Sequence, residues 1–295
     1  MQISPFRWFT RLLSLFPFLT HAAEAPKLGW NTPKIVSQYA AHSQLQEEWQ
    51  LEVLGAYHVF QPRESIIEFG SGNGAAAFRM AALTRLKGGH VRGYDISPDM
   101  VAYAERHYPS HENANLAFFP LDNPTFSHTG IENADLIASF CVFHLVEQPD
   151  VILKNMFAAL RSGGKIIISY PIRQPGPFKN AYEETVAQFD LKKPTPKTFN
   201  VSDPHVMRLL LTKAGFIPDI VQHVEPLNIF PTHQAFLDWC LGTLPANWRI
   251  PENLQEAACL YFIQRFLVHT GQDKLDKNQP LRFPGHRLDV VAIKR

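Results

Sequence analysis

The spacing of hydrophobic residues predicts alternating helices and strands over the first half of the chain. Between about residues 37 and 59 they recur every three to four positions, which is typical of an amphipathic helix. Short apolar runs then alternate with helical segments. The expected strands are 66–69, 91–95, 116–119, 135–140 and 165–169, and the expected helices are 75–86, 97–108 and 149–161. This alternation predicts a doubly wound α/β domain with a mostly parallel sheet.

The regular alternation of expected strands and helices ends after Pro171. Residues 171–200 are rich in Pro and Lys and suggest an excursion along the surface. The remaining expected elements are a helix at 203–214, a sixth strand at 216–224, two or three amphipathic helices within 230–270, and a final strand at 288–293. We therefore expect a folded domain at 34–295, made of a core at 60–225, a helical cap at about 230–284 and a last strand at 286–295.

The N-terminal 25 residues have two interpretations. Two arginines precede a short apolar stretch at 12–19, and Ala23 and Ala25 offer a small-residue cleavage site, as in a secretory signal. The stretch is interrupted by Pro17 and is far too short to span a bilayer as a helix. Residues 1–25 are either a removable signal or an N-terminal extension, and no integral membrane span is expected.

Composition and charge favour a globular chain without a nucleic-acid partner. The chain is 45% apolar and 19% charged, and 28 Lys and Arg against 27 Asp and Glu leave a formal net charge of +1. The three cysteines are widely spaced, and histidines such as His205, His223 and His233 stand alone in the sequence. We therefore expect buried thiols and no metal site.

Glycines cluster directly after the first strand, in Glu68-Phe69-Gly70-Ser71-Gly72-Asn73-Gly74. Gly70 and Gly72 allow a tight turn and a close approach of the backbone to a ligand at a helix start. The spacing also fits a loose dinucleotide fingerprint. Glu68 favours a different ligand, because a carboxylate two residues before the first glycine repels a pyrophosphate and attracts an amino group or a sulfonium.

Two further acids follow the next strands at the same edge of the expected sheet. Asp95 ends the second strand, where an acid can accept hydrogen bonds from both hydroxyls of a ribose, or can simply favour the dipole of the next helix. Asp122 follows the third strand and either accepts from an adenine amino group or is an ordinary loop residue. Together with Glu68, these acids predict a nucleoside site.

Three segments resemble motifs of class I S-adenosylmethionine-dependent methyltransferases. IIEFGSGNG at 66–74 resembles the first motif, and VRGYDISPDM at 91–100 is similar to the second. SFCVFHLVEQPDVILKNMFAALRSGGKIIIS at 139–169 resembles the fourth strand, its helix and the Gly-Gly turn. The resemblance covers roughly residues 37–225 and implies a Rossmann-like, seven-stranded fold with S-adenosylmethionine as cofactor.

The resemblance also implies which residues meet the cofactor. Glu68 would bind the methionine amino group, Asp95 the ribose and Asp122 the adenine, with the glycine loop along the cofactor. The full expected set is Glu68, Gly70, Ser71, Gly72, Gly74, Asp95, Ile96, Asp122, Asn123 and Phe140.

Shorter matches suggest the methyl acceptor. YAAHSQLQ at 39–46, FHLV at 143–146 and FLDWCLGTLP at 236–245 resemble segments of the trans-aconitate, juvenile-hormone-acid and malonyl-carrier O-methyltransferases, although Leu145 replaces a Trp. This implies in-line O-methylation of a small or carrier-bound carboxylic acid. A carboxylate needs no general base, so alignment and exclusion of water can supply much of the acceleration.

Three residues are candidates on the acceptor side, each with a purely structural alternative. His144 could orient an acceptor oxygen or take a proton from a hydroxyl, or it is a strand-end histidine held by backbone. Gln46 could hydrogen-bond the acceptor or the methionine carboxylate, or it is an exposed helical glutamine. Trp239 could line the substrate site, or it only packs in the cap.

Two other functions stay open. An NAD(P)-binding oxidoreductase would suit the loose glycine spacing, and a protein that binds S-adenosylmethionine without turnover would also keep the loop and the acids. Because S-adenosylmethionine is made and recycled in the cytoplasm, we expect a cytoplasmic location unless residues 1–25 act as an export signal.

Overall fold

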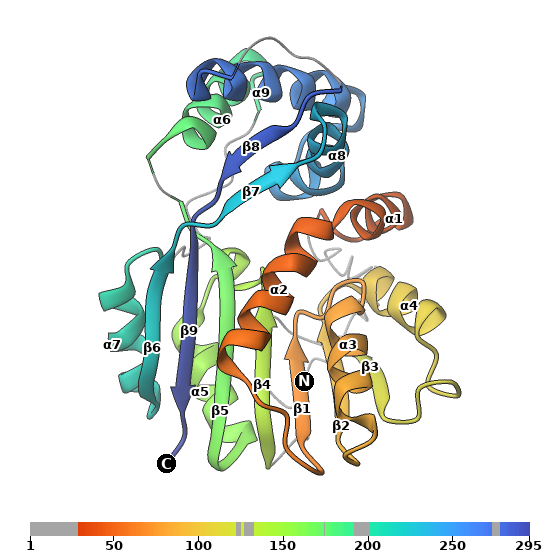
Figure 1. Cartoon of the computed structure of the whole chain (residues 1–295), viewed down its shortest axis with the longest axis vertical. Helices are drawn as coiled ribbons and strands as arrows, with labels where there is room; N and C mark the ends of the chain where they lie inside the picture. The colour runs from red at the N-terminus through yellow and green to blue at the C-terminus, as the bar shows by residue number, and fades with distance from the viewer. Residues whose placement is uncertain (1–28, 122–124, 127–132, 174, 192–200, 273–277) are drawn as a thin grey trace, which may run out of the picture.

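One seven-stranded sheet organises the molecule (Figure 1). The computed structural model describes residues 29–121, 125–126, 133–173, 175–191, 201–272 and 278–295. The sheet order is β3-β2-β1-β4-β5-β9-β6, and β9 runs antiparallel to both its neighbours. Its strands are β1 Ser65–Phe69, β2 His90–Asp95, β3 Leu116–Pro120, β4 Ala134–Phe140, β5 Leu160–Pro171, β6 Ile217–Val224 and β9 Arg287–Ile293. This confirms the predicted doubly wound, mostly parallel sheet.

Helices cover both faces of the sheet. Alternate residues of β1 enter different cores: Ile66 packs beneath α2 and α3, and Ile67 packs with α5 and α7. The helices around the sheet are α1 Pro33–His42, α2 Gln44–Tyr57, α3 Ala75–Arg85, α4 Pro98–His107, η1 Phe143–Leu145, α5 Pro149–Ala159 and α7 Pro204–Ala214. Burial on both faces explains why the strands are almost continuously apolar in sequence.

A separate cap lies beyond the carboxyl ends of the parallel strands (Figure 1). It contains α6 Pro177–Gln188, β7 Leu227–Phe230, α8 His233–Trp248, η2 Glu252–Leu254, α9 Gln255–Thr270 and β8 Leu281–Pro284. Its core is aromatic, and Phe236, Phe262 and Phe266 are fully buried. Burial of each such side chain contributes about 1.5–3 kcal/mol. Most of the cap comes from the chain between β6 and β9, whereas α6 lies between β5 and α7 in sequence.

Two elements differ from the sequence prediction. The segment expected to run along the surface contains α6, which packs on α9 and buries Ala181, Thr185 and Val186. The prolines and lysines of residues 171–200 hid the helical pattern of α6 in the sequence. The single leading helix expected at 37–59 is two helices, because the backbone turns at Ser43.

The structure also bears on the expected absence of a membrane span. Among the described helices, none combines the length and the hydropathy needed to cross a bilayer.

Candidate cofactor and acceptor site

The glycine loop turns sharply between β1 and α3. Gly70, Gly72 and Gly74 have φ values of +75°, +52° and +83°, in the left-handed region that favours glycine. A Cβ on Gly70 would lie 2.2 Å from Cγ2 of Val142, so no larger residue fits there. The N–H groups of Gly70 and Ser71 both donate to the Tyr94 carbonyl, at 2.7 and 2.9 Å. The loop is thereby fastened to the end of β2.

Glu68 is buried beneath this loop with part of its carboxylate unpartnered. Its side chain is 1% exposed, and Oε2 has no hydrogen-bond partner among the described residues. Burial raises the pKa of Glu68 well above its usual value, and the Asp95 charge adds to the rise against a hydrogen bond from the Ala77 backbone. A buried carboxylate oxygen without a donor fits a cationic amino group.

Asp95 ends β2 and faces the same loop. Its carboxylate accepts from the backbone N–H groups of Gly72 and Ser97, both at 2.8 Å. Burial raises its pKa, while these bonds and one from the Ile96 backbone oppose the rise. Three backbone donors leave one of the four acceptor positions of a carboxylate free, so Asp95 can still accept from a ribose hydroxyl. Ile96 is half-buried beside it.

The leading helix covers the loop with an aromatic side chain. Tyr39 of α1 lies against Gly72, where an added Cβ would be 3.8 Å from Cε1 of Tyr39. Burial raises the pKa of Tyr39, and the charges of Cys141, Glu47, Glu68 and Asp95 add to the rise. The Tyr39 phenol is therefore protonated at neutral pH, near the carboxyl groups of Glu68 and Asp95. Ser71 contributes a second buried oxygen, Oγ, without a partner in the described part of the chain.

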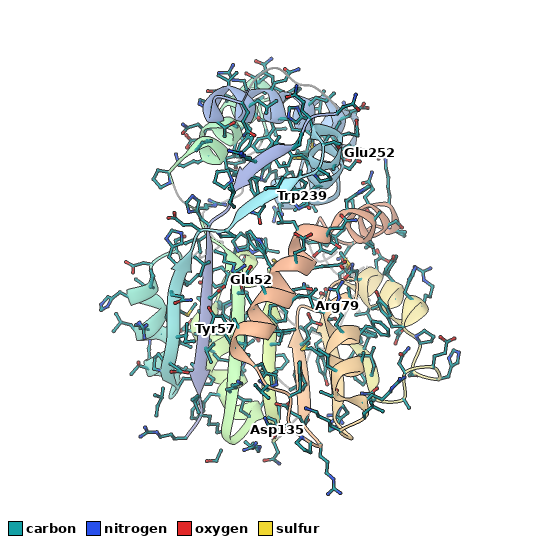
Figure 2. The ribbon with its side chains drawn as sticks, viewed as in Figure 1. Glu52, Tyr57, Arg79, Asp135, Trp239 and Glu252 are labelled. Atoms are coloured by element: carbon teal, nitrogen blue, oxygen red, sulfur yellow. The ribbon has the colours of Figure 1, made fainter. Side chains whose placement is uncertain are left out.

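Gln46 and Trp239, two of the residues expected on the acceptor side, are in contact with each other. The Trp239 indole N–H donates to Oε1 of Gln46 at 3.1 Å, and Nε2 of Gln46 donates to Oγ1 of Thr243 at 3.3 Å. Gln46 is buried, so it is not the exposed helical glutamine of the structural alternative. Figure 2 shows Trp239 where the cap meets α2. Two residues 193 positions apart, selected separately from the sequence, are thus hydrogen-bonded.

His144 stands in η1, just beyond the end of β4. Burial lowers its pKa to about 4, and the positive charge of Arg173 acts in the same direction. Its Nδ1 atom is buried with no hydrogen-bond partner in the described residues, so a backbone contact does not hold that nitrogen. The imidazole is uncharged at neutral pH and is a weak base.

The comparisons with known proteins agree with this geometry. A family model described as a methyltransferase domain matches residues 61–213. Arsenite methyltransferase of Halobacterium salinarum is 27% identical over 55% of this chain and 39% of that protein. Juvenile hormone acid O-methyltransferase of Drosophila melanogaster is 21% identical over 79% of this chain and 80% of that protein.

Solved structures share the fold. Phosphoethanolamine N-methyltransferase 2 of Haemonchus contortus, solved with S-adenosylhomocysteine, superimposes with a TM-score of 0.56 at 16% identity, over 84% of this chain and 52% of that one.

The family model decides the assignment, since it spans just over half of the chain. This chain belongs to the methyltransferase-domain family. The class I fold and the cofactor expected from sequence, S-adenosylmethionine, are confirmed at the level of the family. The methyltransferase spans 39% of the halobacterial relative and 30% of human arsenite methyltransferase, so the substrates of those proteins do not transfer to it.

The contacts of all the expected cofactor residues of the methyltransferase remain predictions, and for three of these residues the described structure adds no support. Asp122 and Asn123 lie outside the described residues, and the contact of Asp122 with adenine stays untested. Phe140 is 4% exposed at the end of β4 and packs in the core beneath α3, which leaves little of its ring for a ligand. Cys141 follows it with φ +56°.

Sequence reasoning missed an ionic network between α2 and β9. Arg287 at the start of β9 donates to both carboxylate oxygens of Glu52 at 2.9 Å, and to Asp289 at 2.8 and 3.1 Å. Tyr57 and Ser169 also donate to Asp289. Glu52 and Tyr57 lie along α2 over the sheet (Figure 2). No local signal links residues 235 positions apart, so only the fold reveals this network.

One histidine expected to stand alone has partners. Nε2 of His223, in β6, lies 3.1 Å from Nδ1 of His286, which follows β8. The Glu225 carboxylate is near both imidazoles. The expectation of isolation was wrong because β6 and β9 pair in the sheet and bring these positions together.

Proposed function

We propose that this methyltransferase transfers the methyl group of S-adenosylmethionine to a carboxylate oxygen of a small or carrier-bound acid. The hydrogen-bonded pair of Gln46 and Trp239 carries the proposal. It joins the two segments that resemble carboxyl O-methyltransferases, one in the leading helices and one in the cap. The similarity to juvenile hormone acid O-methyltransferase supports it, because it extends over four fifths of both chains.

The weak basicity of His144 also supports a carboxylate. When bound, S-adenosylmethionine supplies a methyl group on a sulfonium, which a nucleophilic oxygen can take without prior movement of a proton. A base with a pKa of about 4 is poorly matched to deprotonating a hydroxyl at neutral pH. A carboxylate is already ionised, so His144 need only orient it, while the aromatic cap excludes water.

Arg173 supplies a positive charge close enough to His144 to affect its pKa. Two other arginines near the site are neutralised, Arg79 by Glu47 and Arg287 by Glu52 and Asp289. Arg173 is exposed, acts electrostatically on both His144 and Tyr182, and is paired with no acidic side chain in the described ranges. This charge would attract an anionic acceptor.

Arsenite is a less suitable acceptor on the same observations. Trivalent arsenic is held by thiolates, and burial raises the pKa of the Cys141 thiol to about 12. Cys240 and Cys259 are fully buried in the cap. The matches to arsenite methyltransferases cover between 35% and 55% of this chain.

A labelled-methyl assay tests the proposal. The panel contains monocarboxylic and dicarboxylic acids of increasing length, dicarboxylic half-thioesters on a phosphopantetheine carrier, the matching alcohols and amines, arsenite and phosphoethanolamine. We expect base-labile methyl esters from at least one acid. Label found only in ethers, methylamines or arsenicals would overturn the carboxylate assignment. Tight cofactor binding with no transfer to any member would favour the non-catalytic alternative.

A further inference from the structure

Two short connections join the sheet to the cap, one between β6 and β7 and one between β8 and β9. Three side chains of types that bind metal ions lie together at these connections. His223 is near the end of β6, Glu225 lies between β6 and β7, and His286 lies between β8 and β9. The imidazoles are 28% and 30% exposed and the Glu225 side chain is 68% exposed. The group is therefore open to ions in solution. It is separate in sequence and in chemistry from the glycine loop.

The three ligand atoms have the spacing of a metal site. Nε2 of His223 and Nδ1 of His286 are 3.1 Å apart, and each is 3.8 Å from Oε1 of Glu225. Ligand atoms about 2.0–2.1 Å from a tetrahedral zinc ion lie roughly 3.3 Å from one another. Shifts of a few tenths of an ångström in exposed side chains would bring all three onto one ion.

We propose that His223, Glu225 and His286 bind a divalent transition-metal ion of the zinc type. Two imidazoles and one carboxylate form a borderline ligand set that suits Zn²⁺ or Co²⁺, whereas Mg²⁺ and Ca²⁺ require oxygen ligands. Water completes the fourth position. Three partly exposed ligands predict weaker binding than the four-ligand structural zinc sites.

The backbone around the site holds the ligands in place. His223 pairs with Leu288 in the ladder between β6 and β9. The Gly285 N–H donates to the Pro226 carbonyl at 2.9 Å, and the Ile172 N–H donates to the His286 carbonyl at 2.9 Å. Ligands on a paired strand or in short connections held by backbone hydrogen bonds need little ordering to bind an ion. An ion here would cross-link the two strands that carry the cap.

Calorimetry on the full-length chain, freed of metal and of any histidine tag, tests the site. We expect one Zn²⁺ per chain with a dissociation constant in the micromolar range, and an intense visible absorption on titration with Co²⁺, as tetrahedral coordination gives. His223→Ala and His286→Ala should each abolish both signals, and Glu225→Gln should weaken binding. His205→Ala removes another exposed histidine and should change neither.

Thermal unfolding gives a second readout that does not need activity. Zn²⁺ should raise the melting temperature of the wild-type chain and of His205→Ala, but not that of His223→Ala. Zinc binding equally strong in wild type and in the double variant of His223 and His286 would overturn the site. No binding by wild type at millimolar Zn²⁺ would also overturn the proposed site. The two histidines would then only be hydrogen-bonded to each other.

Discussion

The proposed cofactor side, around Glu68 and Ser71, and the proposed acceptor side, around Gln46 and Trp239, differ in how their buried polar groups are satisfied. In the described residues, Oε2 of Glu68 and Oγ of Ser71 have no partner, whereas Gln46 is bonded through both its oxygen and its nitrogen. Buried polar groups without partners cost free energy unless a ligand completes them. The cofactor side is thus chemically incomplete alone, whereas on the acceptor side Gln46 is satisfied within the protein and Nδ1 of His144 has no partner among the described residues.

Two glutamates beside β1 show the same contrast at close range. Glu64 and Glu68 are both at least 95% buried. Glu64 interacts with Nε2 of His58 at 3.0 Å and accepts from the Gln61 N–H at 3.1 Å, while one oxygen of Glu68 has no partner in the described chain. Burial therefore does not distinguish the two glutamates, whereas the unpartnered oxygen of Glu68 does.

The largest expected effect is on cofactor affinity. Glu68→Gln should weaken S-adenosylmethionine binding by about 2 kcal/mol, roughly thirtyfold, because it removes the charge that receives the amino group. It should not lower the free energy of unfolding, since a buried acid with a raised pKa costs stability above its unfolded pKa. Calorimetry and thermal unfolding measure the two effects.

Glu64→Gln is the matched control for that variant. It should lower the free energy of unfolding by about 1–3 kcal/mol and leave cofactor affinity unchanged, because Glu64 has its partners within the protein. If both variants changed affinity and stability alike, the contrast between the two carboxylates would be wrong.

The raised pKa of Glu68 also makes cofactor binding depend on pH. The free protein holds a proton on Glu68 at pH values where an ordinary glutamate is ionised, and a bound amino group favours the ionised form. Affinity should therefore rise with pH, by at most about tenfold per unit, until the pH exceeds the pKa in the free protein. Calorimetry from pH 5 to 9 should show this slope in wild type and a shallower profile in Glu68→Gln, where Asp95, whose pKa is also raised, still titrates.

On the acceptor side, Trp239→Phe should raise the KM for the acid about five- to tenfold, because Oε1 of Gln46 loses its donor at a cost of about 1 kcal/mol. Cofactor affinity should not change. Trp248→Phe is the control, since Trp248 is also buried in the cap and packs on Phe178 and Phe262. Equal effects of the two variants on KM would reduce Trp239 to a packing residue.

The smallest effect is expected at Arg173. Its charge is exposed, so solvent screens it, and Arg173→Gln should raise the KM for a carboxylate only about two- to fivefold, corresponding to less than about 1 kcal/mol. Arg85→Gln changes an equally exposed arginine at the end of α3 and serves as control. A KM that is insensitive to Arg173→Gln at low salt would remove the electrostatic part of the proposal.

The two sides also differ in how far the sequence predicts them. The strands, the glycine loop, Glu68 and Asp95 are local signals, because each needs only a few consecutive residues. The pairing of Gln46 with Trp239 and the Arg287 network depend on contacts between distant segments. Tyr39 was part of a recognised segment, but its position over Gly72 follows only from the break at Ser43.

The cap illustrates the same limit. Helices α8 and α9 were expected from their periodicity, whereas α6 was hidden by the prolines and lysines around it. The pairing of β7 with β8 joins segments about 55 residues apart and has no local turn signal. The cluster of His223, Glu225 and His286 depends on those connections and was therefore missed.

Whether Glu68 receives a cationic amino group is measured most directly by a double-mutant cycle on ligand and protein. Calorimetry compares S-adenosylhomocysteine with its analogue lacking the amino group, in wild type and in Glu68→Gln. We expect wild type to bind the parent compound at least about tenfold more tightly than the analogue, and the variant to bind both equally. Equal affinity of wild type for the two ligands would contradict the assignment.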